Sequence, residues 1–185
     1  MKRYLIALAL LLGGALATAP NYYPHKVGMS WTYTSGEVQT YESVRQMNGQ
    51  QVWELSHAYD GKVRYTDYLT FDENGVWLLG VDTGAGIIPY DPPIQVYPAA
   101  PLRVGLSWSS RTRFKGANLV VVDKVIGVEG VVVPFGRYNA FVIRSSLTAQ
   151  GGGASVVDLY FVPGIGVVRY ATQDGGQIDL VDFKP

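Results

Sequence analysis

The two histidines are the residues of this chain best suited to proton transfer or metal binding, and their positions favour neither role. His25 and His57 lie far apart in the sequence, and neither belongs to a His-x-His or His-Glu-x-x-His pattern. His57 continues an alternation with Trp53 and Leu55, so we expect a core histidine bonded to a backbone carbonyl. His25 is expected at the surface. The sequence therefore predicts no metal site and no cofactor.

Acidic residues are the next candidates for chemistry, and most are expected in turns, where an aspartate bonds its own backbone. These are Asp60, Asp72, Glu73, Asp82, Asp91, Asp123, Glu129 and Asp174. Asp67 and Asp158 differ because each interrupts an alternation of apolar residues on a predicted strand, which directs its side chain inward. An inward carboxylate needs a partner, and Arg144 or Arg169 could supply one. We expect a structural buried pair; two glycosidase-like carboxylates are the alternative.

Other catalytic patterns are absent from the sequence. There is no cysteine, which excludes disulfides, thiolate catalysis and cysteine-ligated zinc. There is no nucleophile elbow for serine chemistry, and Gly84-Ala85-Gly86 lacks the third glycine and the helix that dinucleotide binding requires. The triplet from Gly151 to Gly153 is interpreted as a loop. We therefore predict no catalytic residue and a protein that is not an enzyme.

Composition favours a single all-β domain with no nucleic-acid partner. Fifteen basic residues balance fifteen acidic ones, so no overall field attracts DNA, RNA or an anionic bilayer. The chain has 22 glycines and 13 tyrosines with only 16% charged residues, a composition typical of turns and strands. Its 185 residues suffice for one core without cross-links.

The N-terminus has the three parts of a secretory signal. Two basic residues in Met1 to Arg3 precede an apolar run from Tyr4 to Leu12 and a small-residue segment from Gly13 to Ala19. The run is shorter than the roughly 20 residues of a membrane span. We predict a signal peptide over residues 1–19, with cleavage after Ala17 or Ala19, and a β domain over residues 20–185. With no cysteine for a lipid anchor, we expect a soluble periplasmic or extracellular protein of unknown oligomeric state.

From Trp31 onward, short β-favouring runs end in turn signals such as Asn48-Gly49, Asp60-Gly61 and Lys115-Gly116. This spacing predicts about 8 to 11 antiparallel strands. Some runs alternate and others are apolar on successive residues, which favours a barrel-like or strongly curled sandwich-like sheet. Little helix is expected, at most a turn or two over residues 22–27.

Between Thr83 and Pro101 the pattern breaks into glycines and prolines, which indicates a long irregular loop because proline lacks an amide hydrogen. The segment is nevertheless apolar. We expect it to pack across the mouth of the sheet and contact a ligand or partner; an exposed adhesive surface is the alternative. The residues expected to make the contact are Ile87, Ile88, Tyr90, Ile94 and Tyr97.

Two segments of the chain resemble each other. Residues 23–31 read YPHKVGMSW and residues 101–108 read PLRVGLSW, so each places a base, valine and glycine before a serine and a tryptophan. The glycine allows a tight turn and the tryptophan anchors the following strand. An ancestral duplication with pseudo-symmetric halves is one interpretation, and recurrent strand-start chemistry is the other.

These segments, with VVVPFGRY at 131–138 and YFVPGIGVV at 160–168, resemble a group of secreted bacterial β proteins without an assigned function. Its members carry YYPLKVGNSWTY, PLKVGKSW, VTVPAGTF and YYVPGVGLVK in that order. The resemblance covers most of the mature chain and implies a barrel-like or sandwich-like envelope domain with no established reaction. His25 stands where leucine is usual, and Phe135-Gly136-Arg137 replaces Ala-Gly-Thr.

We therefore expect a non-enzymatic exported protein that binds an apolar or amphipathic ligand, or an envelope partner, in the concavity of a curled sheet. A carbohydrate-active hydrolase using inward carboxylates is one alternative. A purely structural component of the cell envelope is another.

Overall fold

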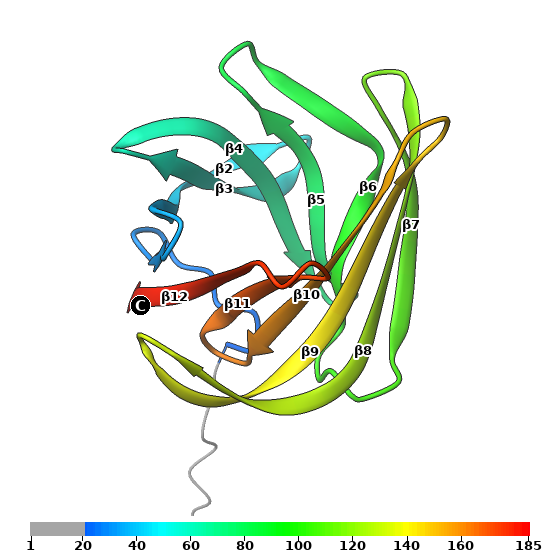
Figure 1. Ribbon diagram of the computed structural model, residues 1–185. Coiled ribbons are helices and arrows are strands. Elements are labelled where there is room, and N and C mark those ends of the chain that lie inside the picture. The colour runs from blue at the N-terminus through cyan, green and yellow to red at the C-terminus, as the bar shows by residue number, and fades with distance from the viewer. Residues whose placement is uncertain (1–20) are drawn as a thin grey trace, which may run out of the picture.

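A computed structural model describes residues 21–185 as twelve antiparallel strands that close into one barrel (Figure 1). The predicted signal peptide, residues 1–19, lies outside the described residues. The strands are β1 (Ser30–Tyr33), β2 (Glu37–Met47), β3 (Gln50–Tyr59), β4 (Lys62–Asp72), β5 (Gly75–Asp82), β6 (Ile87–Pro98), β7 (Ser107–Phe114), β8 (Ala117–Val133), β9 (Gly136–Ala149), β10 (Ala154–Val162), β11 (Gly166–Thr172) and β12 (Gln177–Lys184). Each strand pairs with its neighbours in sequence, and β1 pairs with β12 to close the ring.

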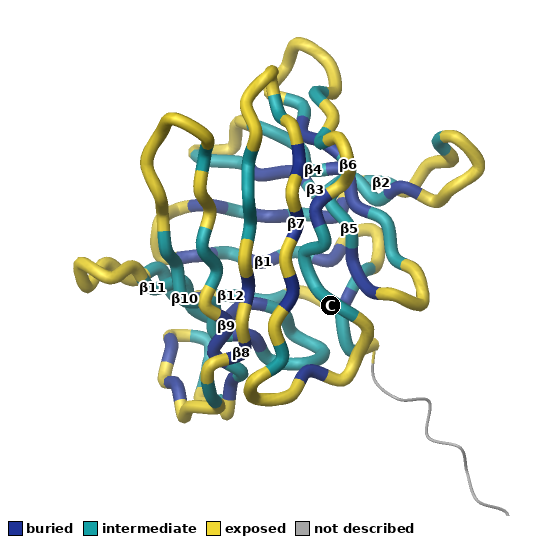
Figure 2. The backbone as a smooth tube through the Cα atoms, turned by 90° about the vertical axis from the view of Figure 1, so that its right-hand side faces the viewer, coloured by how far each residue is buried: buried dark blue, intermediate teal, exposed yellow. Residues whose placement is uncertain are grey.

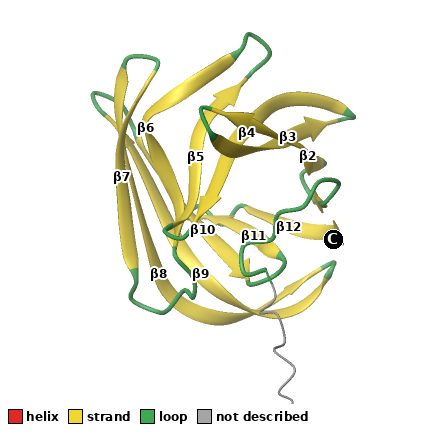
Figure 3. Cartoon of the chain, turned by 180° about the vertical axis from the view of Figure 1, so that it is seen from behind, coloured by secondary structure: helices red, strands yellow, loops and turns green. Residues whose placement is uncertain are grey.

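The all-β prediction is confirmed, because residues 21–185 consist of strands joined by turns and loops (Figure 3). The turn signals mark tight connections, and Asn48, Asp60 and Lys115 adopt the positive φ that such turns require. The expectation of little helix agrees with this all-β structure, and residues 22–27, where at most a turn or two was allowed, form bends, a turn and irregular backbone. The strand count exceeds the predicted range by one.

The additional strand is β6, which contradicts the predicted loop between Thr83 and Pro101. It pairs with β5 at seven positions but with β7 only at Asp91 and Arg113. Prolines are tolerated in a strand that leaves one edge largely unpaired, because that edge needs no amide donors. Gly75 and Gly80 of β5 allow the close approach: a Cβ at Gly80 would lie 2.7 Å from the carbonyl oxygen of Ile88.

Buried and exposed residues alternate along several strands, which gives the dark and yellow stretches of the backbone in Figure 2. Along β7, Trp108, Ser110 and Thr112 are buried while their neighbours are exposed. Along β4, Leu69 packs in the core and Phe71 packs against it. Val63 of the same strand is 57% exposed, because a bulge between His57 and Ala58 shifts the register of β3 against β4.

The two similar segments make the same backbone hydrogen bonds. The amide of Gly28 donates to the carbonyl of Tyr41 at 2.8 Å, and the amide of Gly105 donates to that of Val125 at 2.8 Å. The return bonds match as well, because Tyr41 donates to Met29 at 3.0 Å and Val125 donates to Leu106 at 2.9 Å. Gly28 and Gly105 have φ values of 87° and 89°.

Each segment also precedes six strands, β1–β6 in one case and β7–β12 in the other. Trp31 and Trp108 are both buried and both donate from Nε1 to a backbone carbonyl, that of Ile165 and that of Gln95. This equivalence favours the duplication interpretation over recurrent strand-start chemistry. The barrel is therefore two six-stranded halves joined along two seams, β12–β1 and β6–β7.

The β6–β7 seam is held mainly by side chains. Ser110 Oγ accepts a hydrogen bond from the Gln95 amide at 2.9 Å, and Trp108 Nε1 donates to the Gln95 carbonyl at 3.1 Å. Farther along, Tyr90 stacks on Phe114 with ring centroids 4.7 Å apart. These contacts take the place of a continuous backbone ladder.

Candidate functional site

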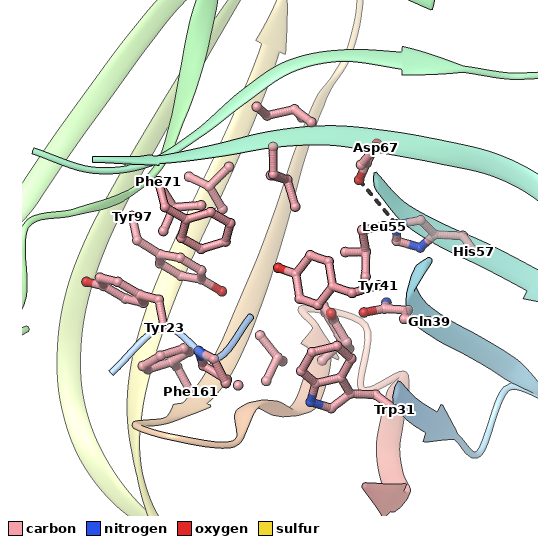
Figure 4. Close-up of a pocket in the computed structure, with 18 of the residues that line it drawn as sticks. Tyr23, Trp31, Gln39, Tyr41, Leu55, His57, Asp67, Phe71, Tyr97 and Phe161 are labelled. Carbon is pink, nitrogen blue, oxygen red and sulfur yellow. Dashed lines mark ion pairs between the residues drawn. The ribbon is translucent and has the colours of Figure 1, made fainter. Parts of the chain in front are cut away.

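A cavity of about 240 Å³ lies inside the barrel and is lined mostly by aromatic and aliphatic side chains (Figure 4). Eight of the twelve strands contribute to its wall, together with the N-terminal segment. The lining residues are Tyr23, Pro24, Trp31, Tyr33, Gln39, Tyr41, Leu55, His57, Asp67, Leu69, Phe71, Val76, Leu78, Val96, Tyr97, Phe161, Gly166, Val167 and Tyr170. The barrel walls position these groups because inward residues recur at every second place along each strand.

Part of the cavity wall comes from the segment before β1. Tyr23 stacks on Tyr97 with ring centroids 5.0 Å apart and planes 6° from parallel. The hydroxyl of Tyr23 donates to the carbonyl of Pro98 at 2.8 Å, so its polar tip is satisfied. Tyr22 accepts a hydrogen bond from the amide of Leu102. The segment before β1 is thus fixed to the second of the two similar segments, residues 101–108.

The polar atoms of two other aromatic side chains also bond to the protein. Trp31 Nε1 donates to the carbonyl of Ile165 at 2.6 Å, and the Tyr33 hydroxyl donates to that of Val167 at 2.9 Å. Burial raises the pKa of Tyr33, Tyr41 and Tyr97 above the ordinary value for tyrosine, so these side chains are neutral at physiological pH. The aromatic wall therefore offers the cavity mainly apolar surface.

One corner of the cavity is polar, with Gln39, His57 and Asp67 on the adjacent strands β2, β3 and β4. His57 Nδ1 lies 2.7 Å from Oε1 of Glu37, which also accepts a hydrogen bond from Gln39 Nε2 at 3.2 Å. On its other side, His57 Nε2 lies 3.2 Å from Oδ2 of Asp67. The imidazole stacks on Tyr65 with ring centroids 4.1 Å apart.

The two carboxylates determine the protonation of this corner. Burial disfavours the charged imidazole, but Asp67 and Glu37 outweigh it and raise the pKa of His57 above its ordinary value. Burial likewise favours a protonated Glu37, yet the hydrogen bonds from His57 and Gln39 lower the pKa of that carboxyl. The corner accordingly favours an imidazolium between two carboxylates.

The structure corrects both histidine predictions. His57 is buried as expected, but its partner is the carboxylate of Glu37 instead of a backbone carbonyl. His25 is half-buried, because its ring stacks on Phe71 with centroids 3.8 Å apart and meets Trp53 edge-on. In residues 21–185, no group of three or more potential ligand side chains forms a metal site.

The predicted inward ion pairs are only partly right. Asp67 does face the cavity, but its partner is His57 and neither Arg144 nor Arg169. Asp158 pairs with Arg144 through two 2.8 Å hydrogen bonds, yet the pair lies on the outer wall, where the Arg144 side chain is 44% exposed. The prediction failed there because β9 and β10 place these two residues opposite each other on the outward face.

Arg169 forms a different pair from the one expected. It donates to both carboxylate oxygens of Asp179 on β12 and to the carbonyl of Val132 at 2.9 Å. Its guanidinium lies over the ring of Tyr160, 5.9 Å from the centroid. Neither Arg169 nor Asp179 lines the cavity.

Of the five residues expected to contact a ligand or partner, only Tyr97 lines the cavity. Ile94 is buried, Ile88 and Tyr90 are half-buried, and Ile87 is 37% exposed. They do not form the flap across a barrel mouth that the sequence suggested, because they belong to the wall strand β6.

Three inward polar residues escaped sequence reasoning. Glu37 and Gln39 alternate with Val38 and Thr40 along β2 and were not predicted to face inward. They share a strand face with Tyr41, and this aromatic residue was the signal that the face is buried. Asp123 was interpreted as a turn residue, whereas it lies within β8 and is buried. Its position at the end of the run Val120 to Val122 was the signal for a buried strand.

No protein-family model and no curated protein matches the chain. Among solved structures, the barrel is similar to that of a candidate lipoprotein from Parabacteroides distasonis ATCC 8503, with a TM-score of 0.50 and 14% identity over 89% of this chain and 99% of that one. A candidate exported protein with a YmcC-like fold from Bacteroides fragilis NCTC 9343 is 13% identical, with a TM-score of 0.46 over 90% of this chain and 100% of that one. At such identities, the first likeness concerns the fold alone. Residues 21–185 contain no helix that could cross a membrane.

Proposed function

We propose that this protein is an exported, non-enzymatic barrel of the cell envelope that binds a small apolar molecule in its interior. The observation that carries the proposal is the cavity of about 240 Å³, whose wall is aromatic and aliphatic except at one polar corner. A cavity of about 150 Å³ lined by similar side chains is enough for benzene. The volume here therefore suits a molecule of about two fused rings.

Export rests on the signal pattern of residues 1–19, and the barrel of the Parabacteroides protein, described as a candidate lipoprotein, is in keeping with it. The hydrolase alternative is less well supported. Glu37 and Asp67 lie on opposite sides of His57, and Glu37 is bound to that histidine and Gln39. Carboxylates of a glycosidase instead face each other across a site wide enough for a sugar ring.

Native mass spectrometry of the protein purified from the envelope of its own host tests the proposal. We expect a retained small molecule, and its loss when Leu55→Phe fills the cavity from β3. Val63→Phe is the matched control, because Val63 faces outward on the neighbouring strand and its variant should keep the molecule. The bare polypeptide mass in all three proteins, with no binding of added naphthalene, would contradict the proposal.

A further inference from the structure

The polar corner of the cavity contains a buried donor without an aligned acceptor. The side chain of His57 is only 7% exposed, and its Nε2 makes no hydrogen bond within the described residues 21–185. Asp67 Oδ2 is 3.2 Å away, but at an angle unsuited to a hydrogen bond. A buried N–H left in this state costs free energy, so a group that completes its bonding gains affinity.

The chemistry of the two neighbours restricts that group. His57 Nδ1 is engaged by Glu37, so Nε2 is the ring nitrogen that still lacks a hydrogen-bond partner, and it is buried beside Asp67. An imidazolium Nε2–H donates and therefore requires an acceptor on the ligand. Asp67 is an acceptor, so the atom beside it should carry a hydrogen.

Three polar groups that a ring-sized ligand commonly carries can be compared. A carboxylate would accept from His57 but would meet the like charge of Asp67. An ammonium would donate to Asp67 but has no lone pair for Nε2–H and would meet a like charge. A hydroxyl accepts from one and donates to the other, and it remains neutral.

From this geometry we infer that the cavity takes an apolar alcohol or phenol, whose hydroxyl bridges His57 Nε2 and Asp67. The inference rests on the proposed function and adds the chemical class of the ligand to it. Gln39 contributes by holding Glu37, which in turn fixes the orientation of the imidazole.

Calorimetric titration at pH 6 with four ligands of one shape tests the inference: naphthalene, 2-naphthol, 2-naphthoate and 2-naphthylmethylammonium. We expect 2-naphthol to bind about tenfold more tightly than naphthalene, and both charged ligands to bind more weakly than 2-naphthol. Asp67→Asn should reduce the preference for 2-naphthol and weaken the exclusion of 2-naphthoate. The matched control is Asp158→Asn, which alters a carboxylate on the outer wall and should leave the order unchanged.

The outcomes separate the two proposals. If naphthalene binds while 2-naphthol has no advantage, or if either charged ligand binds as tightly as 2-naphthol, the assignment of a hydroxyl is wrong and the apolar site remains. An unchanged preference in Asp67→Asn would also overturn it. If none of the four ligands binds the wild-type protein, the proposed function fails together with the inference. The wild-type series decides the matter even if a variant folds poorly.

Discussion

Gln39 and Asp123 occupy equivalent positions in the two halves of the barrel. Gln39 lies opposite Trp31 in the β1–β2 pair, and Asp123 lies opposite Trp108 in the β7–β8 pair. Gln39 donates a hydrogen bond to the carboxylate of Glu37. Asp123 belongs to none of the ion pairs formed within residues 21–185. The two halves have thus diverged at one inward position.

Asp123→Asn should stabilise the protein at pH 8 but not at pH 4. Burial raises the pKa of Asp123 to about 6, although a hydrogen bond from Ser145 opposes the shift. The folded state therefore binds this proton more tightly, and the cost of ionisation develops as pH rises from about 4 to 6. The loss of folding stability caused by this ionisation amounts to at most about 3 kcal/mol. Thermal unfolding at both pH values measures it, with exposed Asp182→Asn as control; equal effects at pH 4 and pH 8 would refute the assignment.

The imidazole of His57 should titrate above its ordinary value of about 6.5. The groups that face it are Glu37 and Gln39 on β2 and Asp67 and Tyr65 on β4. Because the pKa is raised, the stabilisation is complete below pH 6.5 and is lost as pH rises through the folded-state value. The stabilisation from Glu37, whose pKa is lowered, is instead lost as pH falls below its ordinary value.

Nuclear magnetic resonance can follow the two imidazoles separately, with His57→Gln to assign the signals. The expected result is a His57 midpoint above 6.5. A midpoint below 6.5 would mean that desolvation outweighs the two carboxylates, and the corner would then contain a neutral imidazole.

Gly28→Ala and Gly105→Ala should destabilise the protein by similar amounts. Both glycines have a positive φ near 90°, and an added Cβ would meet no atom within 4 Å at either site. The cost is therefore conformational and amounts to about 1 to 2 kcal/mol. Gly153→Ala is the control, because that glycine has open space and no positive φ. Denaturant unfolding gives the three values, and a large loss at only one motif would argue against equivalent halves.

The β6–β7 seam should exchange its amide hydrogens faster than the other strand pairs. Its backbone pairing is limited to Asp91 and Arg113, whereas β7 pairs with β8 along its whole length. Amides without a carbonyl partner are protected only by burial and side-chain contacts. Hydrogen exchange resolved by residue should show fast β7 amides on the β6 side and slow ones on the β8 side. Uniform protection along β7 would show that the seam is as firmly closed as the rest of the barrel.

Much of this fold could be predicted because its signals are local. Turn pairs such as Asn48-Gly49 and Asp60-Gly61 adopt the conformations that their residue types favour, and they divide the chain into hairpins. The motifs at Gly28 and Gly105 predicted related segments, and the structure gives them the same hydrogen bonds. β6 was missed because its prolines exclude a strand paired on both edges but permit one paired mainly on a single edge.

The candidate site was harder to predict because its parts come from strands that only barrel closure brings together. Alternation alone directed Asp67 inward, but it could not identify His57 as the partner or add Glu37. Polar residues at alternate positions normally indicate a solvated face, and β2 instead turns Glu37 and Gln39 into the interior. Asp158 shows the reverse error, because β10 turns Leu159 and Phe161 inward and so places the opposite alternating set, with Asp158, on the outer wall.

A crystal structure of the protein with 2-naphthol would show whether the barrel interior holds a ring-sized alcohol. The rings should lie in the cavity between Tyr97 and Leu55, with the hydroxyl oxygen within hydrogen-bond distance of His57 Nε2 and Asp67. An interior occupied by ordered water or by rearranged side chains, with the ligand absent or bound only to the outer wall, would contradict this placement.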